Sequence, residues 1–327
     1  MKGMWSKVQH DAAYIQLEKM NKEKWSKEES EVDSVLESLA DKNGRNPNIV
    51  FILADDMGWA DLTCYGGGKV RGTETPNLDQ MAFEGMKFLS FYSEPSCTPT
   101  RTALMTGRHP VRTGLTEVLW PGSTQGLDPG EKTIASILSD VGYDTAFYGK
   151  WHLGDANEQQ PQNHGFDEAY FTVYNAAPFV WGDKKIGAFE WPESKEFAEK
   201  YKIQGILEAK KGERAQEVEK LSSERLKTYE ETLTNKTVDF ISNHAEGDKP
   251  FFCYFAASKL DYWGVHPEWE GKSQAGTPFA DEMMEHDHNV GRVLQTIRDK
   301  GIADNTLVVW MSDTGSVHWP VIAHPDY

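Results

Sequence analysis

The stretch Asn48-Ile-Val-Phe-Ile-Leu-Ala54 is a continuous apolar run that leads directly into the acidic pair Asp55-Asp56. An uninterrupted apolar run of this length is typical of a central strand in a parallel sheet, because such a strand is buried on both faces. Similar runs recur along the chain, and segments with helical spacing separate them. The other runs are 145–148, 250–257 and 306–311, and the helical segments are 75–85, 133–142 and 279–301. This alternation predicts an α/β fold with a doubly wound, mostly parallel sheet flanked by helices.

Two segments depart from this alternation. Residues 11–42 are polar, with apolar residues loosely spaced as in a helix, and the turn-forming pairs Asn43-Gly44 and Asn46-Pro47 follow them. Residues from about 192 to 245 are rich in Glu and Lys and also have helical spacing. The sequence therefore predicts an N-terminal helical arm over 1–46 and one large domain over 47–327, with a helical insertion at about 192–245.

Overall composition excludes some partners. The 327 residues carry a formal net charge of −17, whereas nucleic-acid binders need a positive surface. A site for an anion in such a chain must be locally basic, because the global charge repels anions. Three cysteines without paired spacing give no disulfide framework and no zinc motif.

The sequence also bears on compartment. The lysines near Met1 are not followed by an apolar stretch of the signal-peptide kind, and no run approaches 18 apolar residues. We therefore expect a chain without a membrane span, cytoplasmic as written, or periplasmic or secreted if a leader has been removed.

Every apolar run ends in ionisable or polar side chains. In an open α/β sheet, ligands bind beyond the carboxyl ends of the strands. The residues at these ends are Asp55 and Asp56, Lys150 and His152, Lys259 and Asp261, and Asp313 and Thr314. Acids and bases that meet at one edge predict a metal site facing an anion site. Read alone, an acidic pair such as Asp55-Asp56 is equally consistent with a helix cap and a solvated surface.

The segment SCTPTRTALMTGR, residues 96–108, carries a cysteine at a predicted helix start. Pro99 suits the first turn of a helix, so Cys97 falls near its N-terminus. The helix dipole there favours an anion and is expected to lower the pKa of a thiol. Arg101 lies one turn further on and can reach the same spot. The alternative for an isolated cysteine is a small buried apolar side chain.

Three motifs together resemble the type I, formylglycine-dependent sulfatases, a family that includes arylsulfatases. The pattern Cys-x-Pro-x-Arg with x-x-Leu-x-Thr-Gly-Arg after it resembles the signature in which the cysteine is oxidised to formylglycine. The sequence GKWHLG at 149–154 resembles the second signature, and NIVFILADDMG at 48–58 resembles the opening strand with its first metal ligands. The likeness runs from about residue 47 to residue 315.

The resemblance implies an alkaline-phosphatase-like core and a sulfate-ester hydrolase. The implied metal ligands are Asp55, Asp56, Asp313, Thr314 and modified Cys97. Ca²⁺ is the expected ion, with Mg²⁺ or Mn²⁺ as alternatives. The implied catalytic residues are Cys97, Arg101, Lys150, His152, Lys259 and Asp261. Arg101 and Lys150 resemble the groups that hold the nucleophile and the sulfate, and His152 resembles the residue that takes a proton from the formylglycine hydrate. The implied partners are a small-molecule sulfate ester and a formylglycine-generating or equivalent maturation enzyme.

The sequence departs from the family pattern in three places. Asp261 stands where a histidine normally protonates the leaving oxygen, and Thr314 stands where an asparagine normally binds the metal. Family members also continue past the position of Tyr327 with a lysine-bearing loop and a small C-terminal antiparallel sheet. His266 is a nearby substitute for the acid. These departures leave two alternatives to an active sulfatase: a phosphonate monoester or phosphodiester hydrolase on the same site, and a catalytically impaired metal-binding homologue.

A second acidic and histidine-rich cluster, Glu285-His286-Asp287-His288, has the composition of a metal site. Consecutive residues of a helix point in different directions, so these four side chains cannot converge on one ion. We predict core and surface roles for them.

Overall fold

The computed structural model describes residues 12–175, 200–201, 203–258 and 264–316, and the chain divides into two compact units, Met1–Pro47 and Asn48–Tyr327. The described part of the first unit is one helix, α1 (Ala12–Asn43). Ion pairs one helical turn apart, Lys24 with Glu28 and Lys27 with Glu31, lie on its exposed surface. The helix predicted over 11–42 is thus confirmed.

In its described residues, the second unit is built on a seven-stranded sheet in the order β5-β4-β3-β2-β6-β1-β7. The strands are β1 (Asn48–Ala54), β2 (Asp144–Lys150), β3 (Glu168–Thr172), β4 (Ile206–Lys210), β5 (Gln216–Glu219), β6 (Phe251–Ala256) and β7 (Thr306–Ser312). Strands β3, β2, β6, β1 and β7 are parallel, and β4 and β5 continue the sheet antiparallel at one edge. The predicted mostly parallel sheet is confirmed, although β3 had no counterpart in the sequence prediction.

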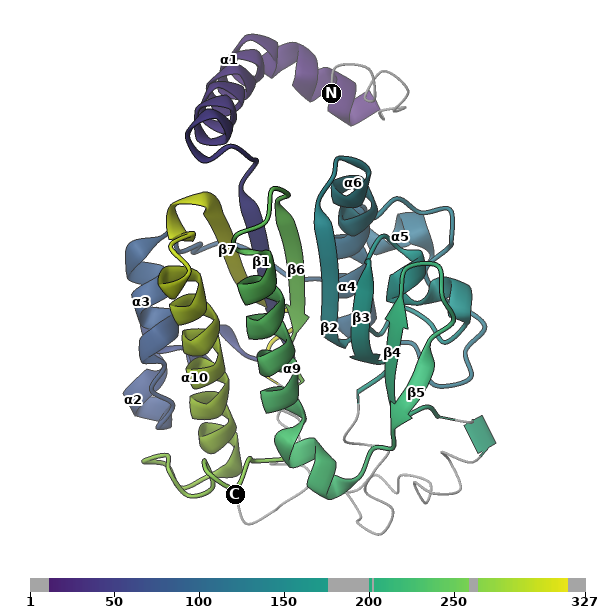
Figure 1. Cartoon of the computed structure of the whole chain (residues 1–327), viewed down its shortest axis with the longest axis vertical. Coiled ribbons are helices and arrows are strands. Elements are labelled where there is room, and N and C mark those ends of the chain that lie inside the picture. Colours follow the sequence, from purple (N-terminus) through teal and green to yellow (C-terminus); the bar gives the residue numbers. More distant parts are fainter. Residues whose placement is uncertain (1–11, 176–199, 202, 259–263, 317–327) are drawn as a thin grey trace. The chain divides into compact units, whose positions relative to one another are not determined.

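Helices cover both faces of this sheet (Figure 1). They are α2 (Gly68–Arg71), α3 (Pro76–Glu84), α4 (Cys97–Thr106), α5 (Pro110–Thr113), α6 (Ile134–Asp140), α9 (Ser223–His244) and α10 (Pro278–Asp299). Single 3₁₀ turns lie at Trp59–Asp61, Thr63–Tyr65, Asn157–Gln159, Pro161–Asn163 and Ala303–Asn305. Helices α9 and α10 pack on one face, and α4 and α6 lie on the other. Among the helices in the described ranges, none combines the length and apolar character needed to cross a membrane.

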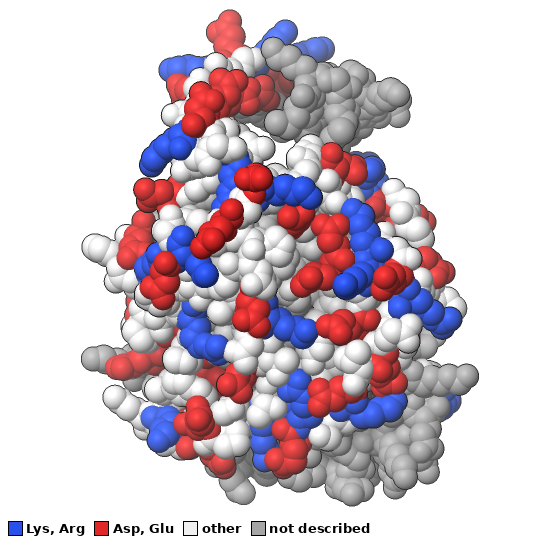
Figure 2. All heavy atoms as spheres, viewed as in Figure 1, with Lys and Arg blue, Asp and Glu red and all other residues white. Residues whose placement is uncertain are grey.

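Charged side chains of both signs are mixed over the face that carries α9 and α10 (Figure 2). Pairs such as Lys236 with Glu208 and Arg298 with Glu84 lie at the surface. Because opposite charges alternate here, the net charge of −17 does not create a uniformly acidic surface on this side.

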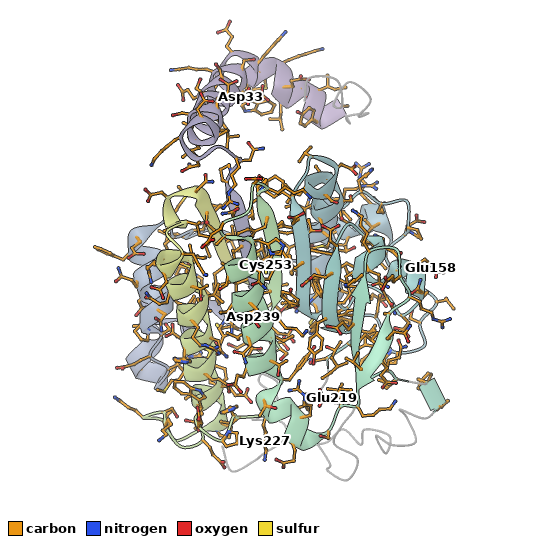
Figure 3. All side chains as sticks on the ribbon, in the orientation of Figure 1. Asp33, Glu158, Glu219, Lys227, Asp239 and Cys253 are labelled. Atoms are coloured by element: carbon orange, nitrogen blue, oxygen red, sulfur yellow. The ribbon has the colours of Figure 1, made fainter. Side chains whose placement is uncertain are left out.

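The three cysteines are all free thiols. Cys253 lies on β6 and is fully buried in the interior that α9 covers (Figure 3). Cys64 and Cys97 are partly exposed. Burial raises the pKa of the Cys253 thiol, so this side chain behaves as a small apolar group.

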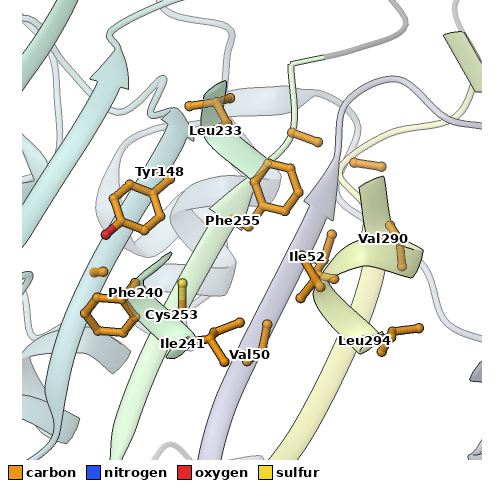
Figure 4. Close-up of a cluster of buried hydrophobic side chains, with 14 of the residues drawn as sticks. Val50, Ile52, Tyr148, Leu233, Phe240, Ile241, Cys253, Phe255, Val290 and Leu294 are labelled. Carbon is orange, nitrogen blue, oxygen red and sulfur yellow. The ribbon is translucent and has the colours of Figure 1, made fainter. Parts of the chain in front are cut away.

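Alternate residues of each central strand enter two separate cores. Val50 and Ile52 of β1 pack with residues of α9 and α10 such as Phe240 and Val290 (Figure 4). Leu53 belongs to the opposite core, which includes residues of β2, α4 and α6. Two-sided burial explains why these strands read as uninterrupted apolar runs, since each buried apolar side chain contributes about 1.5–3 kcal/mol.

The helical prediction for 192–245 is wrong in its first described part and correct in its second. Residues 206–219 form the hairpin of β4 and β5, and α9 then occupies Ser223–His244. Gly212 lies between the two strands and has a left-handed backbone conformation, with φ +76°, which glycine adopts without steric cost. The hairpin forms because β4 hydrogen-bonds to β3. This tertiary pairing outweighs the helical spacing of the segment, and local composition does not encode it.

Close contact between β2 and β6 depends on Gly149. A Cβ atom at this position, where φ is +120°, would lie 1.7 Å from the carbonyl oxygen of Ala256. We expect Gly149→Ala to lower the free energy of unfolding by about 3 kcal/mol or more, because the backbones must separate. Gly142→Ala is the matched control: φ is +95° there and no atom lies within 4 Å of the added carbon, so about 1 kcal/mol is expected. Denaturant unfolding of both variants measures the difference, and equal losses would contradict the steric argument.

Candidate active site

The carboxyl ends of β1, β2 and β7 bring the predicted site residues to one edge of the sheet. Asp55 and Asp56 follow β1, Lys150 ends β2, and Asp313 follows β7. Cys97 and Arg101 reach the same edge from α4. Potential ligand atoms of Asp55, Asp56, Cys97 and Asp313 all lie within 4.8 Å of one another.

Helix α4 begins at Cys97, as the position of Pro99 predicts. Ser96 has extended backbone geometry, and its carbonyl oxygen accepts the first helical hydrogen bond, from the Thr100 amide at 3.0 Å. Proline fits this first turn because it has no N–H to leave unpaired. The side chain of Arg101 lies one turn on and is buried.

Two buried cations bind two buried carboxylates. Lys150 Nζ donates to both oxygens of Asp55 at 2.7 and 2.8 Å. Arg101 donates to Asp55 Oδ1 at 3.1 Å, to Asp313 Oδ2 at 2.9 Å and to the Lys150 carbonyl oxygen at 2.7 Å. Burial by itself raises the pKa of Asp55, but Lys150 and Arg101 hold it below its usual range. A buried network of this kind is stable only while each charge keeps its partners.

Among the described residues, the cluster contains three acids, Asp55, Asp56 and Asp313, but two cations, Lys150 and Arg101. Asp56 accepts a hydrogen bond from the Thr314 hydroxyl, and its own backbone N–H donates to Asp313 Oδ1 at 3.2 Å. Burial, and then the negative charge of Asp55, raise the pKa of Asp56. An excess carboxylate in a buried cluster of oxygen ligands is the arrangement that a hard divalent cation would neutralise, so these residues fit a metal ion.

Cys97 lies beside Lys150 and the acids. Its Sγ atom is 3.4 Å from Lys150 Nζ and 4.0 Å from carboxylate oxygens of both Asp55 and Asp56. The expectation that the helix N-terminus lowers the thiol pKa is wrong. Burial raises the pKa of Cys97 well above its usual range, and the attraction of Lys150 does not offset burial together with the three surrounding carboxylates.

His152 is oriented by a backbone carbonyl. Its Nε2 atom lies 3.0 Å from the carbonyl oxygen of Leu119, which can only accept, so Nε2 carries the ring proton. The other nitrogen, Nδ1, is buried and has no hydrogen-bond partner within the described residues. Burial, and then the charges of Lys150 and Arg101, lower the pKa of His152 to about 3. The imidazole is therefore neutral near pH 7 and presents Nδ1 as a proton acceptor.

Two site residues have unusual backbone geometry. Asp56 and His152 have φ of 56° and 61°, and they are the non-glycine residues with positive φ in the described ranges. Each such conformation costs about 1–3 kcal/mol unless the surroundings enforce it, and strain of this kind concentrates at functional sites. The backbone thus turns sharply at the ends of β1 and β2, where the two side chains must enter the site.

The remaining predicted residues fall into two groups. Lys259 and Asp261 lie outside the described residues, so their predicted roles stay predictions. Thr314 lies in the site, with its hydroxyl hydrogen-bonded to Asp56. His266, the substitute considered for the acid, is engaged elsewhere: Nδ1 accepts from the Glu268 amide and Nε2 lies 3.4 Å from Glu231.

The four residues at 285–288 serve separate neighbours, as predicted from helical geometry. Glu285 accepts from the His266 amide, Asp287 from the Asn77 and Leu78 amides, and His286 contacts Glu230. His288 lies beside the Trp269 ring. Leu119, whose carbonyl sets the His152 tautomer, was not predictable from the sequence, because a backbone carbonyl gives no residue-specific signal.

Comparison with known proteins identifies similar chains. The Sulfatase family model matches residues 47–321. The N-acetylgalactosamine-6-sulfatase of Canis lupus familiaris is 34% identical over 293 residues, which are 83% of this chain and 50% of that protein. Arylsulfatase A of Homo sapiens is 35% identical over 291 residues, with coverage of 83% and 52%. The crystal structure of the PsFucS1 sulfatase from Pseudoalteromonas sp. has a TM-score of 0.79 at 33% identity and covers 88% of this chain and 59% of that one. The chain therefore spans about half the length of the curated relatives it matches.

Proposed function

Because the chain belongs to the sulfatase family, we propose that it hydrolyses sulfate esters, with Cys97 converted to formylglycine as its nucleophile. The observation that carries the proposal is the position of Cys97 Sγ, 3.4 Å from the Lys150 ammonium and beside three carboxylates. A nucleophile, a cation for the anionic ester and a site for a metal thus meet at one sheet edge.

We assign the metal to Asp55, Asp56, Asp313 and the modified side chain of residue 97, and propose Ca²⁺ as the ion. The three carboxylates supply hard oxygen ligands, and Ca²⁺ accepts several of them in flexible geometry, whereas Mg²⁺ usually keeps more of its waters. A thiol is a soft ligand, so an oxygen-bearing side chain at residue 97 suits the site better than the cysteine does. When bound, the ion would neutralise the excess acid and act as a Lewis acid on oxygen.

Formylglycine explains how the site can work although the Cys97 thiol is protonated. Its hydrated aldehyde carries two hydroxyl groups. One attacks sulfur, and loss of the proton of the other re-forms the aldehyde and releases sulfate. Lys150 and Arg101 are buried cations whose pKa values rise above their usual range because of Asp55 and Asp313, although burial opposes this. They remain charged and stabilise negative charge on the transferring sulfate group. His152 Nδ1 is the acceptor for a hydroxyl proton.

Lys259 and Asp261 complete the proposal at the end of β6. Lys259 is assigned to the sulfate group and Asp261 to the leaving oxygen. A carboxyl group donates a proton near neutral pH only if its surroundings raise its pKa, so this assignment needs a site of low polarity around Asp261. A maturation enzyme that oxidises Cys97 is the partner that the proposal requires.

Two measurements on one preparation test the proposed function. Conversion of the Cys97 thiol to the aldehyde should lower the mass of the peptide containing Cys97 by about 18 Da. The modified protein with Ca²⁺ should then hydrolyse an aryl sulfate, and 6-sulfated N-acetylgalactosamine is the second substrate to try because relatives carry that name. Faster turnover of an aryl phosphonate monoester or phosphate diester would favour the alternative hydrolase. Complete modification without turnover of any of these esters would identify an impaired homologue.

A further inference from the structure

A buried polar network lies behind the strand ends, on the face covered by α9 and α10. Glu230 of α9 is fully buried, in the stretch between Lys227 and Asp239, which Figure 3 labels. Its Oε2 atom accepts from the Ser258 amide at 2.8 Å and from the Ser258 hydroxyl at 3.2 Å. Its Oε1 atom lies 3.2 Å from His286 Nδ1 in α10, and Trp310 Nε1 of β7 donates to His286 Nε2 at 3.1 Å.

The proton positions in this network follow from which groups can only donate and which can only accept hydrogen bonds. The Trp310 indole N–H can only donate, so His286 Nε2 accepts and carries no proton. The ring proton is therefore on Nδ1 and is donated to Glu230. Glu230 receives three donors, two from Ser258 and one from His286, and an ionised carboxylate is the side chain that can accept all three.

The network binds Ser258, which follows the central strand β6. Strand β6 lies between β2 and β1, and Ala256 is paired with Leu53 of β1 and with Gly149 of β2. Ser258 is two residues beyond Ala256, and Asp55 is two residues beyond Leu53. Ser258 and Asp55 therefore lie at the same height along the two parallel strands, just past the edge of the sheet. Lys259 follows Ser258 directly in the sequence, and Trp310 precedes Asp313 by three residues.

We propose that Glu230 is a positioning residue, oriented by His286 and Trp310, that sets through Ser258 the direction in which the chain leaves β6 at the active-site edge. The inference rests on the proposed function, because Ser258 follows β6 at the sheet edge where the neighbouring strands bring Asp55 and Lys150 to that site. A neutral packing residue of similar size could not replace Glu230, since both Ser258 donors and the His286 N–H need acceptors.

Glu230→Gln tests the proton arrangement. Glutamine has one acceptor oxygen, so its amide N–H₂ must face either Ser258 or the His286 N–H, and His286 cannot move its proton while Trp310 donates to Nε2. We expect exchange of the Ser258 amide to accelerate about tenfold and kcat/KM for an aryl sulfate to fall about tenfold. Glu231→Gln, the same change on the exposed neighbouring residue, should leave both unchanged.

The double variant Glu230→Gln with Trp310→Phe provides the discriminating result. Phenylalanine removes the indole donor, so His286 can shift its proton to Nε2 and accept from the glutamine amide, whose oxygen then returns to Ser258. Protection of the Ser258 amide and kcat/KM should recover toward wild type, which a loss of packing alone would not produce, since Trp310→Phe removes further packing.

Hydrogen–deuterium exchange at Ser258 and aryl sulfatase kinetics are measured on all four proteins. Unchanged exchange in Glu230→Gln, failure of the double variant to recover or to fold, or altered exchange with unaltered kcat/KM would each overturn the proposal. Absence of turnover in the modified wild-type protein would instead count against the proposed function, and the exchange results would still decide whether Glu230 anchors Ser258.

Discussion

Cys97→Ala should reduce kcat for an aryl sulfate by at least about 10⁴-fold in protein whose wild-type form carries the aldehyde. The variant lacks both the nucleophilic oxygen and the second hydroxyl that releases the product. The remaining charges of Lys150 and Arg101 would still bind a sulfate group, so inhibition by free sulfate should be retained. Steady-state kinetics with sulfate as a competing ligand measure both effects.

Cys64→Ala is the matched control for this substitution. Cys64 is also a partly buried free thiol, but it lies in the 3₁₀ turn Thr63–Tyr65 and packs against the core of the α10 face. Its replacement should leave kcat unchanged. Retention of more than a small fraction of activity in Cys97→Ala would show that residue 97 is not the nucleophile.

Asp56→Asn should weaken Ca²⁺ binding by about a hundredfold, because it removes the charge that has no cationic partner in the described site. The same change should stabilise the metal-free protein by about 1 kcal/mol, since a buried like charge beside Asp55 is removed. Asparagine tolerates the positive φ of this position about as well as aspartate does, so the backbone need not change. The two effects have opposite signs, which separates a metal ligand from a merely structural acid.

Thermal unfolding with and without Ca²⁺ measures both effects. Wild type at a Ca²⁺ concentration of a hundred times Kd should gain about 2.7 kcal/mol, and Asp56→Asn should gain little at that concentration. Asp144→Asn makes the same chemical change at the opposite end of β2, where Asp144 pairs with Lys249, and should respond to Ca²⁺ as wild type does. An equal Ca²⁺ response in Asp56→Asn would exclude Asp56 as a ligand.

Local sequence was sufficient for the elements whose pattern is strong. The run Asn48–Ala54 matches β1 residue for residue, because a strand covered on both faces carries apolar side chains at every position after Asn48. The start of α4 at Cys97 followed from Pro99, since proline restricts its own backbone. The hairpin of β4 and β5 could not be predicted in this way, because its short strands form by pairing with β3 and their composition is also compatible with a helix.

The sequence by itself determined which residue types stand at the strand ends, because strand ends and helix starts are encoded within a few neighbouring residues. It placed Asp55, Asp56, Lys150 and Asp313 at one edge of a parallel sheet. Only the tertiary structure decided the protonation of the site: the raised pKa of Cys97, the His152 Nδ1 atom that no described residue contacts by a hydrogen bond, and the proton order from Trp310 to Glu230. These properties depend on burial and on charges and hydrogen-bond partners from segments distant in sequence, so no local pattern contains them.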